Sequence, residues 1–379
     1  MRRRRKLGEI VAERIVDDIV RRGWNEGEVL GTEADFMERF RISRATFREA
    51  ARQLEWQGAA GMRRGASGGL TVRAPPRGAI ISALKTYFEL TKIGRKDLDA
   101  VAGVLRAAPQ LYAGSSGNVA IELFLEALDE RCVAELARER SVEGEGPKLS
   151  EKIVLRLVRD IDEADLATGA NLGNESVLQQ RYGVSRAVMR EALRLLELHR
   201  VVRVKTGAAG GIIVDGFDPD YTIGLASTYL TFARIPLSHL WAAQSSLELA
   251  AVDGFAAHAD EPTLLKLKAA LGRLERAPAS HYLASARQFH QIVADNSGNR
   301  VIALFVGILL TFSLPVLPVP DARFLPELKS QHRRLIDAVE AGDVAVAAQQ
   351  MRAMFEYSRR WIAGIEADIA RRQLRDASA

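Results

Sequence analysis

The sequence predicts a mainly α fold in which two related halves follow one another, and three observations carry this prediction. Apolar residues recur at helical spacing, and strands are predicted only in four short stretches, at about 60–64, 70–73, 201–205 and 212–214. A long part of the sequence recurs further along the chain at a constant offset of 142. With 379 residues, 47% of them hydrophobic and 27% charged, the chain has the size and composition of two or three soluble domains.

The repeat is visible as short identical stretches. Ser43-Arg44-Ala45 returns as Ser185-Arg186-Ala187, and Gly68-Gly69 returns as Gly210-Gly211, both at the offset of 142. Between 27–55 and 169–197, 14 of 29 aligned positions are identical, whereas unrelated sequences would share roughly two. The pattern indicates a duplicated domain pair.

A second match has a different offset. Ser116-Gly117-Asn118 matches Ser297-Gly298-Asn299 at an offset of 181, and the two offsets differ by 39, which is the length that the first copy lacks. The stretch 78–138 is therefore interpreted as a truncated helical remnant of the longer stretch 216–375, which is predicted to be an all-α effector bundle. The charged, glycine-containing residues 139–148 are predicted to be a linker.

Charge and cysteine content narrow the possible classes. A net charge of +5 is compatible with a polyanionic partner without proving one. Cys132 is the only cysteine, so neither an intramolecular disulfide nor a cysteine cluster for zinc or iron–sulfur can form.

The sequence shows neither a targeting segment nor a membrane span. The basic start, 1–6, is followed by several acidic residues before Arg22, which is unlike a signal peptide. The uncharged stretch 301–320 offers only about 14 helical residues before Pro315, too few to cross a bilayer, and is predicted to be a buried core helix. The protein is expected in the cytoplasm.

Each half begins with three predicted helices. The first helix, over 7–22, carries an apolar stripe made of Leu7, Val11, Ile15 and Ile19. Thr32 is a suitable N-cap for a short helix that ends at Phe40, and Ser43 for a third helix that ends near Gln57. A glycine-tipped hairpin follows the third helix.

The third helix has two distinct faces. Its apolar face is formed by Phe47, Ala50, Ala51 and Leu54. Its basic stripe is formed by Arg44, Arg48 and Arg52, and the second copy repeats this stripe as Arg186, Arg190 and Arg194. The second copy also repeats the caps, as Asn174 and Ser185. Three helices followed by such a hairpin predict two winged helix–turn–helix domains, at 1–75 and 149–215.

The basic stripes have two interpretations. An arginine every four residues is commonly a solvated helix face. On the third helix of a winged domain, however, arginine reads guanine O6 and N7 or grips phosphate, and the stripe occurs in both copies. Thr46 is a further candidate contact, but its counterpart Val188 cannot form a hydrogen bond, which suggests that the two helices prefer different half-sites.

At these residues the chain resembles the GntR family of bacterial transcription regulators. The motifs that carry the resemblance are Ser43 to Ala50 and Ser185 to Leu193. Downstream, Leu240 to Ala257, Phe289-His290 and Gln331-His332 resemble the helical FCD effector domain of the FadR-like subgroup. The resemblance implies binding to double-stranded DNA and, usually, a small-molecule effector. For Gly68 and Gly210 at the wing tips, it suggests a close approach to phosphate beside their ordinary role in a turn.

The chain departs from the family pattern in several places. Gly31 and Gly173 stand where the family generally has a proline before the second helix. Gln244 stands where the effector domain usually has an arginine that helps to hold acidic effectors. The expected pocket, with Gln244, His290, His332 and Met354, should therefore favour a less acidic and more apolar effector, or none.

The resemblance also bears on a metal. Relatives hold zinc or nickel with one aspartate and three histidines. Two of these positions match here, His290 and His332, while the others fall at Ala286 and Met354. Alanine offers no donor and a thioether is a poor ligand for a hard divalent ion, so we expect neither a metal nor another cofactor. Candidate apolar walls of the pocket are Phe289, Phe305, Phe355 and Trp361.

We find no motif that indicates catalysis. The six histidines form no legible catalytic arrangement, and 207–211 is not a dinucleotide fingerprint because it joins two strands. The leading hypothesis is a regulator in which the effector domain sets the spacing of two DNA-reading helices within an intrachain pseudo-dimer. The alternatives left open are a further homodimer, and a scaffold whose winged helices contact protein rather than DNA.

Overall fold

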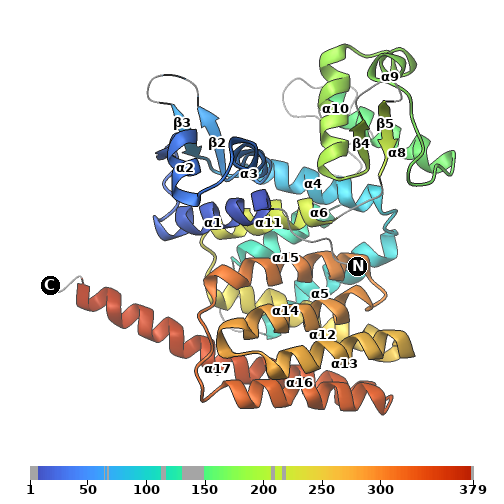
Figure 1. Ribbon diagram of the computed structural model, residues 1–379. Helices are drawn as coiled ribbons and strands as arrows, with labels where there is room; N and C mark the ends of the chain where they lie inside the picture. Colours follow the sequence, from blue (N-terminus) through green and yellow to red (C-terminus); the bar gives the residue numbers. More distant parts are fainter. Residues whose placement is uncertain are drawn as a thin grey trace. The chain divides into compact units, whose positions relative to one another are not determined.

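The computed structural model describes residues 7–63, 65, 68–111, 117–129, 149–205, 210–215 and 219–376 (Figure 1). The chain forms two compact units, each made of two segments. Unit 1 comprises Met1–Lys92 and Asp129–Phe232, and unit 2 comprises Ile93–Leu128 and Ala233–Ala379. The basic tail 2–6, Cys132 and the predicted linker 139–148 lie outside the described residues.

The first winged helix belongs to unit 1 and contains three helices and three strands. They are α1 Leu7–Arg21, β1 Val29–Gly31, α2 Glu33–Phe40, α3 Arg44–Trp56, β2 Ala60–Arg63 and β3 Gly69–Val72. The strands form an antiparallel sheet in the order β1-β3-β2, in which Met62 of β2 lies opposite Leu70 of β3. Strand β1 was not predicted from the sequence, because three residues are too few to show an alternating pattern.

The second winged helix has the same order of helices. Its elements are α8 Leu149–Glu163, α9 Glu175–Tyr182, α10 Arg186–Leu198, β4 Val202–Lys205 and β5 Gly211–Val214. The two strands pair antiparallel, and the position of a third strand is reduced to one bridge between Asn171 and Ile213. The predicted hairpins are therefore confirmed to within one or two residues.

The apolar faces predicted from helical spacing are the cores of the two winged helices. In α3 the buried residues are Phe47, Ala50, Ala51 and Leu54, and in α10 they are Met189, Ala192, Leu193 and Leu196. These are the same four positions in the two copies. The prediction that Leu7 belongs to the buried stripe of α1 was wrong. Leu7 is the first residue of the helix, and 56% of its surface is exposed.

Glycine is required just before α2 and before the N-cap of α9. Gly31 has φ +140° and Gly173 has φ +95°, a region in which side-chain-bearing residues are strained. Proline is fixed near −65° and is unable to adopt either conformation. The backbone that leads into the second helix therefore has a conformation at Gly31 and Gly173 that a proline could not adopt.

Two further helices belong to unit 1. Helices α4 Arg77–Leu90 and α11 Asp220–Phe232 pack on one another, and Arg77 Nη1 donates to the Tyr229 hydroxyl over 3.2 Å. The ring of Phe232 meets Trp24 of the first winged helix edge-on. The contacts thus group α4 and α11 with the winged helices, whereas the sequence-based boundaries near 78 and 216 placed them with the remnant and the effector bundle.

Unit 2 contains only helices in its described part. They are α5 Arg95–Leu111, α6 Val119–Leu128, α12 Leu237–His258, α13 Glu261–Arg276, α14 Ala279–Asp295, α15 Arg300–Val316, α16 Leu325–Glu340 and α17 Val344–Asp376. Helices α5 and α6 pack against α12 and α15, and α17 packs against α12 and α16 (Figure 1).

The contacts between the remnant and the longer bundle are reciprocal. Asn118 Nδ2 donates to the carbonyl of His239 over 2.9 Å, and Asn299 Nδ2 donates to the carbonyl of Asp97 over 3.2 Å. Asn299 is the counterpart of Asn118 at offset 181, and His239 is the counterpart of Asp97 at offset 142. Such exchanged contacts are the pattern of an isologous, two-fold interface, here within one chain.

An aromatic pair lies at the centre of these contacts. Phe124 of α6 stacks on Phe305 of α15 with ring centroids 4.0 Å apart, and both rings are fully buried. Phe305 is the counterpart of Phe124 at offset 181. Equivalent residues of the two copies therefore stack on one another. This contact joins the remnant to the core of unit 2.

The uncharged stretch near 301 forms the buried helix α15. Its residues from Val301 to Ser313 are almost all buried, and the helix continues one residue past Pro315 before it ends at Val316. Among the described residues, the helices lack the combination of length and apolar character needed to cross a membrane.

A buried histidine gives unit 1 an expected sensitivity to acid. His199 follows α10 with 2% of its surface exposed, and its ring meets Tyr221 edge-on. Burial lowers the pKa of His199 to about 4. The unfolded chain takes up a proton near the ordinary value of about 6.5, so stability from this group is complete above pH 6.5 and is lost as the pH falls toward 4.

We expect His199→Gln to reduce the acid sensitivity of unit 1. Glutamine is the residue at the equivalent position of the first copy, Gln57. Between pH 7 and pH 5, the wild type should lose about 2 kcal/mol that the variant keeps. Hydrogen exchange of the α10 amides at both pH values measures this difference. An equal loss in the variant would show that His199 is not the cause.

Candidate functional site

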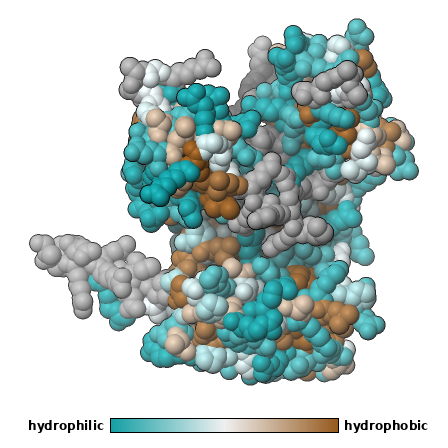
Figure 2. All heavy atoms as spheres, in the orientation of Figure 1, coloured by the Kyte–Doolittle hydropathy of each residue, from teal (hydrophilic) through white to brown (hydrophobic). Residues whose placement is uncertain are grey.

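The first candidate site is formed by the third helix of each winged domain. Ser43 caps α3 by accepting a hydrogen bond from the backbone NH of Thr46, and Ser185 caps α10 by accepting one from Val188. The caps fix where each helix starts, and so which residues occupy its first turns. The visible surface of both winged helices is mostly hydrophilic with smaller apolar patches (Figure 2).

The arginines at the start of each helix are exposed. The side chains of Arg44 and Arg48 are 67% and 64% exposed, and those of Arg186 and Arg190 are 68% and 59% exposed. The third arginines of the stripes, Arg52 and Arg194, are also exposed, while Thr46 is partly buried and shares a hydrogen bond with Ser43.

One glutamate contacts the leading pair of arginines in each domain. Glu33 Oε1 lies 3.3 Å from Nε of Arg44 and 3.2 Å from Nε of Arg48. In the second domain, Glu175 Oε1 lies 3.1 Å from Nε of both Arg186 and Arg190. Sequence reasoning missed these two glutamates, although their identity at offset 142 was a signal that could have found them.

A second glutamate ties each wing to its helix. Glu55 Oε1 accepts from the backbone NH of Met62 over 3.3 Å, and Glu197 Oε1 accepts from that of Val204 over 2.9 Å. Both carboxylates lie at the end of the third helix, and both amides belong to the first strand of the wing. The wing is thereby held to the helix whose stripe carries the arginines.

Glycine is required at the base of each wing. A Cβ on Gly69 would lie 2.4 Å from the carbonyl oxygen of Gly31, and one on Gly211 would lie 2.5 Å from Asn171 Oδ1. The neighbouring Gly68 and Gly210, predicted to approach phosphate, are partly buried just before the second strand. Of each pair, the second glycine is therefore the one that this packing requires.

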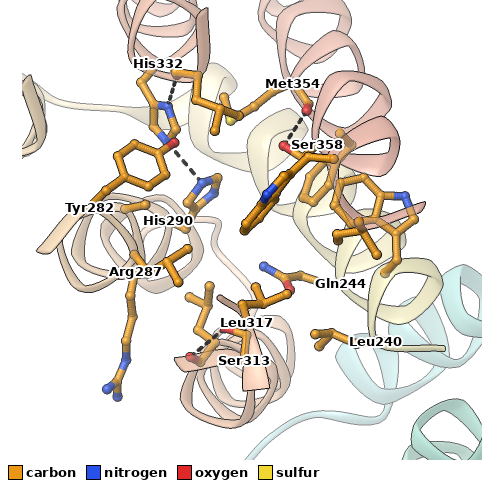
Figure 3. Close-up of a pocket in the computed structure, with 18 residues that line it drawn as sticks. Leu240, Gln244, Tyr282, Arg287, His290, Ser313, Leu317, His332, Met354 and Ser358 are labelled. Atoms are coloured by element: carbon orange, nitrogen blue, oxygen red, sulfur yellow. Dashed lines mark hydrogen bonds between the residues drawn. The ribbon is translucent and has the colours of Figure 1, made fainter. Parts of the chain in front are cut away.

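The second candidate site is a cavity of about 90 Å³ in unit 2, between α12, α14, α15, α16 and α17 (Figure 3). It contains all four residues predicted from the sequence for an effector pocket, namely Gln244, His290, His332 and Met354. Its volume is several times the 10–15 Å³ that one water needs. Aromatic walls come from Trp241, Tyr282, Phe355 and Trp361.

Two of the four predicted apolar walls were wrong. Phe355 and Trp361 line the cavity, but Phe305 stacks on Phe124 and Phe289 is a fully buried core residue. Helical spacing places these residues on apolar faces without showing which face meets the cavity and which meets a neighbouring helix.

A chain of buried polar groups runs behind the cavity. Gln244 Nε2 donates to Glu248 Oε1 over 2.7 Å, and the other carboxylate oxygen of Glu248 contacts His290 Nδ1. His290 Nε2 lies 3.2 Å from His332 Nε2, and His332 Nδ1 lies 2.7 Å from the carbonyl of Leu328. Glu248 and His332 are each 1% exposed.

Burial and hydrogen bonding together determine the protonation of His332. A carbonyl only accepts, so His332 Nδ1 donates to Leu328, and burial followed by the neighbouring His290 lowers the pKa of His332 to about 3. His332 is then neutral and its Nε2 accepts from His290. His290 therefore lies between two buried partners, the Glu248 carboxyl at its Nδ1 and His332 at its Nε2.

Positive charge is directed away from the cavity. Arg287 is part of the lining, but its guanidinium points away from the cavity (Figure 3), and its Nη2 donates to Thr311 Oγ1 over 3.0 Å. The hydroxyls of Ser313 and Ser358 donate to helix carbonyls and leave only their oxygens as acceptors. These two serines therefore offer acceptors rather than donors to a ligand.

The residues present do not fit a divalent metal. Ala286 and Met354 line the cavity at the two positions where relatives have ligands, and the two imidazoles hydrogen-bond to one another through Nε2. The described residues contain no group of three or more His, Cys, Asp or Glu side chains placed to hold a metal. Two imidazoles alone rarely hold zinc or nickel.

We expect protein purified without a chelator or a metal-affinity tag to contain no stoichiometric zinc or nickel. The reason is the loss of two ligands and the mutual hydrogen bond of the remaining two. Elemental analysis by plasma mass spectrometry measures the zinc and nickel content per chain. One equivalent of metal that disappears in His290→Ala would contradict this prediction.

Known families match the two parts of the chain in which these candidate sites lie. The model of the bacterial regulatory proteins of the gntR family matches the chain twice, at residues 7–68 and 149–212, and the model of the FCD domain matches residues 239–357. The two matches to the first model cover the two winged helices, and the match to the second covers the helices that form the cavity.

Individual relatives are similar to about half of the chain. The uncharacterized HTH-type transcriptional regulator YcbG of Bacillus subtilis is 27% identical over 195 residues, which are 52% of this chain and 82% of that protein. The HTH-type transcriptional repressor NanR of Cronobacter sakazakii is 26% identical over 204 residues, 52% of this chain and 78% of that protein. A solved Streptococcus agalactiae GntR structure is 21% identical and covers 56% of this chain and 99% of its own, with a TM-score of 0.44.

These matches define the class of the protein: a regulator with the gntR-type helix–turn–helix and an FCD domain. The chain combines the helix–turn–helix of the gntR family of bacterial regulatory proteins with an FCD domain, and in this it matches regulators of that family. It is a DNA-binding transcriptional regulator whose C-terminal domain binds the effector that modulates it. The family and its relatives are regulators and not enzymes.

Proposed function

We propose that both third helices, α3 and α10, read DNA, and that one chain supplies the pair of reading helices that ordinary relatives obtain from two subunits. In this proposal, Arg44, Arg48, Arg186 and Arg190 contact base edges or phosphates. Arg52 and Arg194 grip the backbone further along each helix. The wing glycines Gly68 and Gly210 approach phosphate.

The observation that carries this proposal is the exposure of the four leading arginines, all between 59% and 68%. A scaffold whose winged helices pack on one another through this face would bury it within unit 1. An exposed basic stripe at the start of a capped third helix is instead the arrangement that enters a major groove. Both copies have it.

The reciprocal contacts in unit 2 support the intrachain pseudo-dimer. The bonds from Asn118 and Asn299, and the stacked Phe124 and Phe305, are related by the two offsets of the repeat. A family dimer brings two half-sites about one helical turn apart, roughly 34 Å, under its two reading helices. We expect one chain to do the same, with the effector bundle setting the spacing, in the cytoplasm where its DNA lies.

Selection from a random duplex library tests the DNA-reading proposal. We expect enrichment of a motif with two half-sites whose centres lie about one helical turn apart, roughly 10 base pairs. The half-sites should differ from one another, because Thr46 in the first helix is replaced by Val188 in the second. An enriched single half-site would restrict DNA reading to one helix. No enrichment at fixed salt would favour the scaffold.

The effector is proposed to be uncharged and largely apolar. Aromatic side chains line the cavity, His290 is already in contact with the Glu248 carboxyl, and the guanidinium of Arg287 points outward. A carboxylate would enter without a cation to pair with, which is costly in a partly buried site.

We expect benzyl alcohol to bind this cavity at least about tenfold more tightly than benzoate, which has the same ring and a negative charge. Quenching of Trp241 and Trp361, which line the cavity, reports binding. The variant His290→Ala removes a side chain that lines the cavity. A changed affinity of this variant for benzyl alcohol would show that the probe binds in the cavity. Equal or tighter binding of benzoate would contradict the proposed effector chemistry.

A further inference from the structure

In each winged helix, one glutamate on the second helix reaches across to the third and contacts two arginines. Glu33 is the first residue of α2, and its Oε1 lies between Nε of Arg44 and Nε of Arg48, at 3.3 and 3.2 Å. Glu175 is the first residue of α9 and repeats the contact with Arg186 and Arg190 at 3.1 Å. We call each set a carboxylate clamp.

All four arginines use the same atom in these contacts, the Nε. The carboxylate therefore takes the side of each guanidinium and leaves its two terminal nitrogens for another partner. A bidentate contact with guanine O6 and N7 uses two parallel donors of the guanidinium fork. The clamp thus fixes the plane of the guanidinium without blocking its outer edge.

Stabilisation of the fold does not account for this geometry. Exposed ion pairs add little to stability, and these arginines are more than half exposed. A glutamate at the first position of a helix also interacts well with the helix dipole, but that interaction needs no contact with the next helix. The carboxylates are the better covered partners, 25% and 30% exposed, as expected of groups that hold others.

The second clamp is tied more firmly than the first. Gln179 Nε2 donates to Glu175 Oε1 over 3.2 Å, and Arg190 Nε also lies 3.3 Å from Oε2. The position of Gln179 is occupied by Met37 in the first copy, and methionine does not donate a hydrogen bond to Glu33. Removing the clamp glutamate should therefore increase the mobility of the arginines more in the second winged helix than in the first.

We infer that Glu33 and Glu175 are positioning residues that hold two arginines each in the orientation required to read paired acceptors on DNA, and that they raise discrimination between specific and non-specific sequences. Fixing long side chains before binding reduces the entropy lost on forming the specific contacts. A carboxylate near the groove also repels phosphate, which weakens non-specific binding. The inference rests on the proposed DNA reading by α3 and α10.

The test compares Glu33→Gln, Glu175→Gln and a control, Glu38→Gln. Glutamine keeps the size of the side chain and removes its charge. Glu38 lies on the same helix as Glu33 and is exposed, so its variant has the same charge change without a clamp. Affinities are measured at fixed salt for the selected duplex and for a scrambled duplex of equal length.

We expect the ratio of specific to non-specific affinity to fall about fivefold or more in each clamp variant, as for loss of one good base contact. Non-specific affinity should stay the same or rise, because a negative charge has been removed. Glu38→Gln should keep the wild-type ratio. A purely structural role would instead lower thermal stability and leave the ratio unchanged, and that result would overturn the inference.

A measurement without DNA separates the clamp from the DNA-reading proposal. In arginine-labelled protein, the Nε protons of Arg48 and Arg190 should exchange with water several-fold more slowly than in the corresponding Gln variants. Equal exchange rates would overturn the clamp whatever the DNA data show. A wild type that prefers no duplex would overturn DNA reading and, with it, the role of the clamp; a selective wild type with equally selective clamp variants would overturn the clamp alone.

Discussion

Arg48→Ala and Arg190→Ala are each expected to weaken binding to the selected duplex by about 1–3 kcal/mol, roughly five- to 150-fold in Kd. Both side chains are exposed on the N-terminal half of a third helix and present the outer edge of the guanidinium. Because the two positions lie in separate winged helices, the double variant should lose the sum of the two effects. Electrophoretic titration at fixed salt measures all three variants.

The matched control for these variants is Arg273→Ala, an exposed arginine of α13 in unit 2. It removes the same charge and should change binding little beyond the general effect of net charge. If Arg48→Ala and Arg190→Ala resemble this control, the assignment of α3 and α10 as reading helices is wrong. If only one of them differs, a single winged helix reads DNA.

Phe124→Ala is expected to destabilise unit 2 by about 3–5 kcal/mol. The side chain is fully buried and stacks on Phe305, so its removal deletes apolar burial and leaves a cavity between α6 and α15. Phe305→Ala should have a similar cost because it removes the other half of the same contact. The double variant should cost less than the sum, by about 0.5–1.5 kcal/mol, because the paired rings are coupled.

Hydrogen exchange of the amides of α12 and α15 measures these losses within unit 2. Leu265→Ala is the control, because its side chain is 60% exposed and surface truncation changes stability by less than about 0.5 kcal/mol. Exchange in α12 and α15 that is unaffected by Phe124→Ala would mean that the remnant is not part of this core, and the intrachain pseudo-dimer would fail with it.

Local sequence signals were sufficient for the parts of the fold that depend on near neighbours. The helix caps at Thr32, Ser43 and Ser185, and the buried face from Phe47 to Leu54, follow from hydrogen bonding and spacing within a few residues. The repeat supported these predictions, because each feature of the first winged helix could be compared with the equivalent residues of the second.

Features that depend on residues far apart in the sequence could not be predicted from the sequence. The clamp of Glu33 on Arg44 and Arg48 joins two helices across a turn, and a glutamate at a helix start has a sufficient local explanation. Likewise, spacing placed His290 and His332 in one pocket but not in mutual contact, and it placed Phe305 on an apolar face without revealing its partner Phe124. The grouping of α4 with α11 depends on packing between segments far apart in the chain.

The measurement that tests the central claim most directly is the stoichiometry of the complex with a duplex that carries both half-sites. Native mass spectrometry with footprinting of the same complex gives the number of chains per duplex and the bases each one protects. We predict one chain on one duplex, with both half-sites protected, and loss of protection at one half-site in Arg48→Ala and at the other in Arg190→Ala. Two chains bound to one such pair of half-sites, each protecting a single half-site, would contradict it.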